Sequence, residues 1–237
     1  MSVNPVRIGQ NLEAVRSRIT AAAARSGRGP EAVTLVAVTK KRPAEAVGPL
    51  VEAGAIDMGE NYPQELWRKV DELSGLTPPV RWHLIGHLQS NKARRTLPLV
   101  KLIHAVDSLK LLRILDGLVG ELGLKEPPAV CLQVNTSEEE SKHGWSSDQL
   151  LADAEAVASC RAIPIVGLMT MAGWGTTAET ARPSFVALRE TRDRLRARTG
   201  LALAELSMGM SGDFEAAIEE GATLVRVGSA LFEGAVA

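Results

Sequence analysis

Hydrophobic and polar residues divide this chain into two alternating kinds of segment. Short, nearly continuous apolar runs, such as "VTLVAVTK" at 33–40, are followed by longer stretches in which apolar residues recur every three or four positions. The first kind is typical of strands buried on both faces, and the second is typical of helices that bury one face. The pattern predicts strands at 33–40, 56–60, 80–86, 102–108, 129–137, 164–170 and 201–209, and an eighth that begins the segment 223–232.

The stretches between these strands predict helices. We expect them at 43–54, 63–75, 90–100, 109–123, 146–160, 178–198 and 213–221. A further helix precedes the first strand, with Asn4 as its cap and Pro5 at its first position. Strands that alternate with helices eight times predict a closed (β/α)8 barrel of the TIM type, with this extra N-terminal helix, as a single domain over residues 1–237. An open, doubly wound sheet is the alternative.

Composition narrows the kinds of partner. The 237 residues carry 27 basic and 28 acidic side chains, so the chain offers no strong electric field to nucleic acid or to a membrane surface. No apolar run approaches the ~18 residues of a membrane span, and the start of the chain has no apolar signal-peptide core. Cys131 and Cys160 lie in apolar segments without a CxxC motif, as expected of reduced core residues. We therefore predict a cytoplasmic protein without nucleic-acid or membrane partners.

The histidines form no recognisable metal motif. His83 and His87 have the spacing H-x3-H, but they lie on a predicted strand and turn, where they do not share a face as on a zinc-binding helix. His104 and His143 lack a clear pattern of carboxylate partners. We therefore predict no metal site.

Two segments late in the chain have features of an anion site. In "SMGMSGDFEAAI", Ser211 comes just before a predicted helix and is expected to be its N-cap, at a helix end that attracts anions. In "VRVGSALFEG", Gly228 and Ser229 follow the eighth strand, where the glycine lets the backbone approach a ligand and the serine adds a hydroxyl group. Either segment alone is typical of an ordinary cap or turn. Together they predict a phosphate site, because many barrels bind phosphate between the loops after strands seven and eight.

Two lysines end the first strand, and strand alternation distinguishes them. Val36, Val38 and Lys40 share one side of the strand, so Lys40 projects into the barrel mouth if the valines face the interior, while Lys41 points away. A lysine held among apolar walls has a lowered pKa and becomes nucleophilic toward carbonyls. Pyridoxal 5'-phosphate (PLP) combines an aldehyde with a phosphate and forms Schiff bases with lysines. A solvated strand end and a Schiff-base aldolase of phosphosugars are the alternatives.

Seven motifs follow one another from residue 37 to residue 232. They are "AVTKKRP", "GENYPQE", "WHLIGHLQSNKAR", "HAVDSLK", "QVNTSEEESKHGW", "GLMTMAG" and "LSMGMSGDFEAAIEEGATLVRVGSALF". Together they resemble the motifs of the PLP homeostasis proteins, a family of single-barrel PLP-binding proteins. The resemblance implies a (β/α)8 barrel like the N-terminal domain of alanine racemase. It also implies that PLP is the cofactor and that Lys40 carries it as an internal aldimine.

The resemblance implies six further cofactor-binding residues around Lys40. Ser211, Gly228 and Ser229 correspond to the positions that bind the phosphate, and Met210 lies near that turn. The remaining two are Asn61, expected near the ring, and Arg226, expected to approach the pyridine nitrogen.

The resemblance also implies a carrier or regulator of PLP, acting in vitamin B6 homeostasis without substantial turnover. A cationic Arg226 disfavours protonation of the pyridine nitrogen, so the ring stabilises carbanions poorly. The alanine racemases take a second base, a tyrosine, from another domain, which we expect this chain to lack because it ends directly after the barrel. Its only tyrosine, Tyr62, is expected to be a wall residue. A weak PLP-dependent amino-acid racemase is the alternative.

The expected partners are PLP and, as acceptors, PLP-dependent apo-enzymes. We expect a monomer, because the chain has no obvious exposed apolar stripe. Lys142 and Gly144, in "SKHGW", are expected either at the edge of the cofactor mouth or in a solvated loop.

Overall fold

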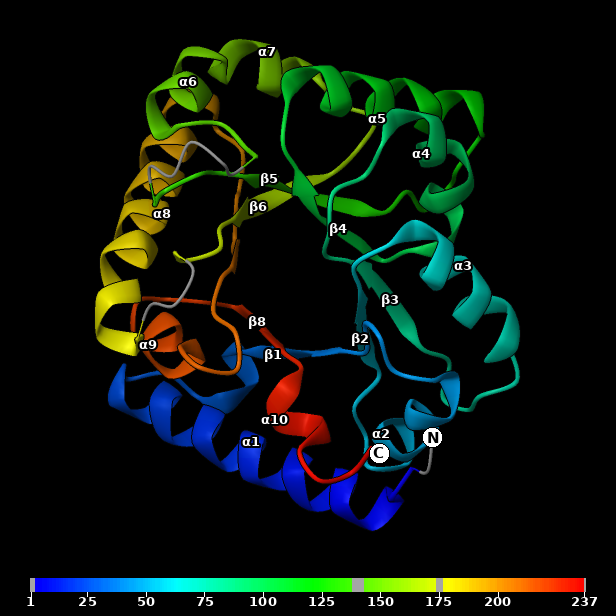
Figure 1. Cartoon of the computed structure of the whole chain (residues 1–237). Coiled ribbons are helices and arrows are strands. Elements are labelled where there is room, and N and C mark those ends of the chain that lie inside the picture. The colour runs from blue at the N-terminus through cyan, green and yellow to red at the C-terminus, as the bar shows by residue number, and fades with distance from the viewer. Residues whose placement is uncertain (1–2, 138–142, 174–176, 237) are drawn as a thin grey trace.

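Eight parallel strands close into a barrel in the computed structural model of the chain, which describes residues 3–137, 143–173 and 177–236 (Figure 1). Each strand pairs with its neighbours in sequence, and β1 pairs with β8 to complete the closure. The strands are β1 (Thr34–Val38), β2 (Asp57–Glu60), β3 (Arg81–Leu84), β4 (Leu102–Val106), β5 (Ala129–Gln133), β6 (Ile165–Met169), β7 (Glu205–Ser207) and β8 (Leu224–Val227). The predicted (β/α)8 fold is thus confirmed, and the open sheet is excluded.

Helices surround the barrel on its outer side (Figure 1). The α-helices are α1 (Pro5–Arg25), α2 (Gly48–Glu52), α3 (Pro63–Glu72), α4 (Ser90–Thr96), α5 (Leu109–Glu121), α6 (Ser147–Ala152), α7 (Ala154–Ser159), α8 (Ala178–Thr199), α9 (Phe214–Glu219) and α10 (Ser229–Phe232). Short 3-10 helices are η1 (Pro30–Ala32), η2 (Ala44–Ala46) and η3 (Leu97–Leu99). None of the helices in the described part of the chain is long and apolar enough to cross a membrane.

The sequence pattern located the helices well and misplaced some of their ends. The helix expected over 146–160 is two short helices that meet at Asp153, whose side chain accepts a hydrogen bond from Trp145 Nε1 (2.9 Å). The helix expected over 43–54 is the 3-10 helix η2 followed by α2. The segment after β8 forms α10, which the sequence pattern did not separate from the strand.

The extra N-terminal helix lies outside the barrel, beside α2, α9 and α10 (Figure 1). The Asn4 side chain accepts a hydrogen bond from the Arg7 N–H (3.1 Å), and Pro5 occupies the first helical position, as predicted. The apolar face of α1 is fully buried and consists of Ile8, Leu12, Val15, Ile19, Ala22 and Ala23. This helix therefore packs against the helices next to β1 and β8.

Alternating residues of β1 belong to two different hydrophobic clusters. Val36 and Val38 belong to the smaller cluster inside the barrel, whereas Ala37 belongs to the large cluster between strands and helices. The parity assumed for the first strand is therefore correct. β1 ends at Val38, two residues earlier than predicted, whereas β2 ends at Glu60 as predicted, so Lys40 and Asn61 both lie in loops beyond the strands.

Candidate functional site

A cavity of about 360 Å³ lies at the carboxyl ends of β1, β2 and β8. All seven residues predicted to bind a cofactor line it: Lys40, Asn61, Met210, Ser211, Arg226, Gly228 and Ser229. The other lining residues are Val38, Ile85, Met171 and Gly212, which sequence reasoning did not identify. The fold therefore brings together predicted residues that are up to 189 positions apart in the chain, Lys40 and Ser229 being the extremes.

Lys40 reaches the cavity from the loop after β1, in line with Val36 and Val38. Its side chain is exposed, so the apolar enclosure expected from the sequence is only partial. Lys41 is also exposed, has a positive φ of 60° and does not line this cavity. It lines an adjoining groove instead, together with Lys40, Arg42 and Tyr62. The lysine selected by strand parity is thus the one whose amine can reach the interior of the mouth.

A buried ion pair supports the residues directly before Lys40 and Asn61. Lys69 of α3 places Nζ 2.5 Å from Glu60 Oε1 and 2.7 Å from the carbonyl oxygen of Thr39, to which it donates. The Thr39 hydroxyl donates to the same carboxylate oxygen of Glu60 (2.6 Å). The sequence contains one indication of this buried ion pair. Lys69 follows Leu66 by three positions, so both residues lie on the buried face of α3. A lysine on an apolar helix face needs a buried partner.

Asn61 lies against the loop after β3. A Cβ atom on Gly86 would meet the Asn61 carbonyl oxygen at 2.2 Å and its side-chain Oδ1 at 2.7 Å. Only glycine at position 86 therefore leaves room for Asn61 in its present position.

The loops after β7 and β8 meet through a serine hydroxyl. Ser211 Oγ accepts hydrogen bonds from the N–H groups of Gly228 (3.2 Å) and Ala230 (3.5 Å). The prediction that Ser211 caps a helix is wrong: α9 begins at Phe214, and Asp213 is its N-cap residue. The physical reason is that the Ser211 hydroxyl is engaged by the loop after β8, while Asp213 Oδ1 accepts from the Met210 N–H (2.6 Å). Ser211 therefore joins the loops after β7 and β8 directly through its hydroxyl group, and not as the cap of a helix. We call these two joined loops the cradle.

Arg226 is a buried cation in the floor of the cavity. Its Nη1 donates to Ser207 Oγ (2.5 Å), and its Nη2 donates to the carbonyl oxygen of Thr170 (2.9 Å). Within the described ranges it forms no ion pair, and burial lowers the pKa of the guanidinium to about 10. Asp213 is also mostly buried, which raises the pKa of its carboxyl group. Arg226 thus presents positive charge to the cavity with neutral hydrogen-bond partners.

Four predicted positions have separate outcomes. Met210 is partly exposed at the cavity edge, and Tyr62 is 54% exposed and lines the adjoining groove rather than the cavity. Lys142 lies outside the described residues. Gly144 does not line the cavity.

Comparison with known proteins places these features in a family. The alanine racemase N-terminal domain family matches residues 10–235 of the chain. The chain is 45% identical over 227 residues to a pyridoxal phosphate homeostasis protein of Pseudomonas aeruginosa, covering 95% of this chain and 94% of that protein. The chain belongs to the pyridoxal phosphate homeostasis protein family. The human family member is 37% identical over 235 residues and is covered to 86% of its length.

Solved structures of the family have the same barrel. PipY of Synechococcus elongatus, determined with PLP bound, superposes with a TM-score of 0.83 at 38% identity and covers 95% of this chain and 99% of that one. Its form without PLP superposes with a TM-score of 0.85. Alanine racemase of Bartonella henselae is only 15% identical (TM-score 0.75) and shares the fold alone.

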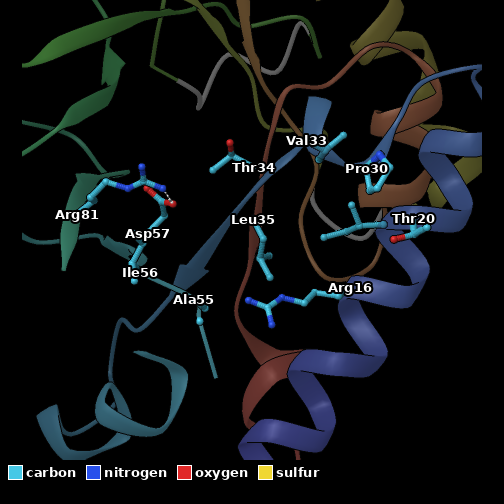
Figure 2. A pocket seen from close by; sticks show the side chains of 12 residues that line it. Arg16, Thr20, Pro30, Val33, Thr34, Leu35, Ala55, Ile56, Asp57 and Arg81 are labelled. Carbon is cyan, nitrogen blue, oxygen red and sulfur yellow. Dashed lines mark hydrogen bonds and ion pairs between the residues drawn. The ribbon is translucent and has the colours of Figure 1, made fainter. Parts of the chain in front are cut away.

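A second cavity, of about 440 Å³, lies at the opposite end of the barrel, between α1 and the amino ends of β1, β2 and β3 (Figure 2). Asp57 and Arg81 form an ion pair on one side of it, and Arg16 lies on the other (Figure 2). Arg16 donates to the carbonyl oxygen of Ala53 (2.7 Å). Among the described residues, no group of three His, Cys, Asp or Glu side chains is placed to hold a metal ion.

Proposed function

We propose that residues 1–237 act as one barrel domain that binds PLP and takes part in intracellular PLP homeostasis. The observation that carries this proposal is the convergence of a lysine amine, a two-loop cradle and a buried guanidinium on one cavity. The name of the family and the PLP-bound structure of PipY support the same ligand.

The residues present fit the parts of PLP. Lys40 supplies the amine to which the aldehyde of the cofactor attaches, and Ser211, Gly228 and Ser229 supply hydroxyl and backbone groups for the phosphate. Asn61 and Met210 border the remaining space. The volume of about 360 Å³ lies within the range of about 300–1,000 Å³ that is usual for small-molecule sites.

Arg226 is the reason to propose holding rather than turnover. Bound PLP acts as an electron sink when its pyridine nitrogen is protonated. If the pyridine nitrogen of bound PLP faces Arg226, the buried guanidinium would oppose its protonation, since like charges repel. The described residues around Arg226 offer it a hydroxyl and a carbonyl oxygen, and no carboxylate bonded to it that could favour the protonated ring. The site therefore favours holding PLP over catalysing reactions on it.

Release would occur through the exposed side of the site. Because Lys40 is exposed, water or an acceptor amine can reach the point of attachment. We expect the protein to be monomeric and to pass PLP to apo-enzymes that require it.

The second candidate function is a weak PLP-dependent amino-acid racemase. One observation favours it: Tyr62 lies in the same groove as Lys40, so a second acid–base group is near the first. Its exposure and the charge of Arg226 argue against efficient proton transfer there.

Attachment can be tested by adding PLP, recording the visible absorption spectrum, reducing with borohydride and mapping the modified peptide. We expect the label on Lys40 and none in Lys40→Ala. Lys41→Ala is the matched control, because it removes the adjacent exposed lysine, and it should label normally. A label on another residue, or no visible band after PLP is added, refutes the proposal.

Turnover can be tested separately by α-proton exchange of amino acids in deuterated water. We expect no exchange above the rate of free PLP. Exchange that requires Lys40 and falls in Tyr62→Phe would establish the racemase alternative instead.

A further inference from the structure

A column of polar side chains crosses the inside of the barrel from one mouth to the other. Its five members are buried and each comes from a different strand: Asp57 of β2, His83 of β3, His104 of β4, Ser207 of β7 and Arg226 of β8. Asp57 lines the cavity at the amino end, where it pairs with Arg81 (Figure 2). Arg226 lines the proposed PLP cavity at the carboxyl end. The column therefore joins the two ends of the barrel.

Hydrogen bonds link every neighbouring pair in this column. Arg226 Nη1 lies 2.5 Å from Ser207 Oγ, which lies 2.6 Å from His104 Nδ1. His104 Nε2 lies 2.9 Å from His83 Nδ1, and His83 Nε2 lies 3.0 Å from Asp57 Oδ1. All four are within hydrogen-bonding distance, and the two that involve Ser207 Oγ are short.

The two ends fix the direction of the whole chain of hydrogen bonds. A guanidinium only donates, so Arg226 donates to Ser207. The Ser207 hydroxyl hydrogen then has His104 Nδ1 as its acceptor, which places the proton of His104 on Nε2. That proton is donated to His83 Nδ1, so His83 also carries its proton on Nε2 and donates it to Asp57, since an ionised carboxylate only accepts.

We propose that His104 and His83 are positioning residues that hold Arg226 toward the cofactor cavity and couple it to the Asp57–Arg81 pair at the opposite mouth. His104 keeps the Ser207 hydroxyl hydrogen away from Arg226, so that the oxygen of Ser207 is free to accept from the guanidinium. If the hydroxyl turned the other way, Arg226 would face a second donor and lose one of its two bonds. What this orientation does to bound PLP rests on the proposed function; the hydrogen-bond chain itself does not.

The surroundings of His104 favour a neutral ring. Burial lowers the pKa of His104 well below its usual 6.5, and the neighbouring His83 and the charge of Arg226 lower it further. Cys131 of β5, buried inside the barrel, lies close enough to Arg226 and to Glu205 of β7 for their charges to act on its thiol. Its own pKa is raised by burial, so it adds no negative charge that would favour a protonated histidine.

The test is the tautomeric state of the histidines in the PLP-free protein, read from long-range 1H–15N spectra. The chain has four histidines, so the ring signals can be assigned by single substitutions. We expect His83 and His104 to be Nε2–H tautomers at neutral pH. In Ser207→Ala, the His104 Nδ1 resonance should move toward that of an unbonded acceptor, and Ser207→Thr, which keeps the hydroxyl, should restore it.

His87→Gln is the matched control. His87 lies in the loop after β3, is exposed, pairs with Asp107 and is not part of the column. Its loss should leave the His83 and His104 signals unchanged. A His104 ring protonated on Nδ1 or on both nitrogens, or a His104 signal that ignores Ser207→Ala, overturns the proposal.

A second measurement uses the loaded protein. Ser207→Ala should weaken PLP affinity about 5- to 10-fold, the usual effect of one lost hydrogen bond, and should shift the visible absorption of bound PLP, whereas Ser207→Thr should do neither. Unchanged affinity and spectrum in Ser207→Ala contradict the coupling to the cofactor. If the unsubstituted protein binds no PLP, the proposed function fails while the tautomer measurement still decides the positioning role.

Discussion

Lys69 and Glu60 form an ion pair with both side chains completely buried, and this pair ties α3 to the ends of β1 and β2. Lys69 Nζ contacts the carbonyl oxygen of Thr39, one residue before Lys40, and Glu60 directly precedes Asn61. The second carboxylate oxygen, Glu60 Oε2, is buried without a hydrogen bond in the described part of the chain. The positions of Lys40 and Asn61, two of the proposed cofactor-binding residues, therefore depend on this one ion pair.

Removing one charge of this pair should be costly. Lys69→Met leaves Glu60 buried without a counter-charge, and we expect a loss of about 3–5 kcal/mol in the free energy of unfolding. The double variant Lys69→Met/Glu60→Gln should lose much less than the sum of the single variants, because no uncompensated charge remains. Denaturant titration of the three variants measures these values.

Arg68→Ala is the control for this experiment. Arg68 is the neighbouring residue on α3, and it forms ion pairs with Glu65 and Glu72 at the surface. Exposed pairs contribute about 0–1 kcal/mol, so this variant should stay close to the unsubstituted protein. A loss in Lys69→Met no larger than in Arg68→Ala would contradict a structural role of the buried pair.

Gly86 should be required for the position of Asn61. The Cβ of Gly86→Ala would come within 2.2 Å of the Asn61 backbone oxygen, so the loop must move. We expect a destabilisation of about 1–3 kcal/mol and weaker PLP binding, measured by denaturation and by fluorescence titration. Gly75→Ala is the matched control, because nothing lies within 4 Å of the added Cβ there. Equal PLP affinity in the two variants would show that Asn61 does not need this space.

The barrel was predictable because its signals are local. Each strand is a short apolar run and each helix has its own periodicity, so the alternation can be read without knowing which segments touch. The same holds for Lys40, since the parity of Val36 and Val38 decides its direction. Family motifs then located the other residues of the cavity.

Contacts between distant segments were not predictable in the same way. Ser211 has the local features of a helix cap, but its hydroxyl is engaged by Gly228, 17 residues later. His104 has no local carboxylate partner, and its bond to Ser207 joins strands 103 residues apart that meet only inside the closed barrel. Such hydrogen bonds depend on which side chains face one another across the interior, and no periodicity encodes that.

The burial of His104 should make stability depend on pH. Because the pKa of His104 is well below 6.5 in the folded protein, below about pH 6.5 the unfolded chain takes up a proton there that the folded chain does not bind. Stability should therefore be constant above that pH and fall below it, by up to ~1.4 kcal/mol per pH unit for this group. Denaturant titrations between about pH 5 and pH 7 measure the slope. His104→Gln should reduce the dependence of stability on pH, whereas His87→Gln should leave the part that comes from His104 in place. An unchanged slope in His104→Gln would show that the pH dependence comes from other groups.

Ser211 should discriminate between cofactors with and without a phosphate. Its hydroxyl joins the loops after β7 and β8 at the cradle, so Ser211→Ala removes both a polar group and the link to the Gly228 N–H. We expect the affinity for PLP to fall about 5- to 10-fold, while the affinity for pyridoxal, which has no phosphate, changes little. Lys40→Ala should instead weaken both ligands, because both carry the aldehyde. Ser74→Ala, an exposed serine in the loop after α3, serves as the neutral control. Equal losses for PLP and pyridoxal in Ser211→Ala would place the phosphate elsewhere in the mouth of the barrel.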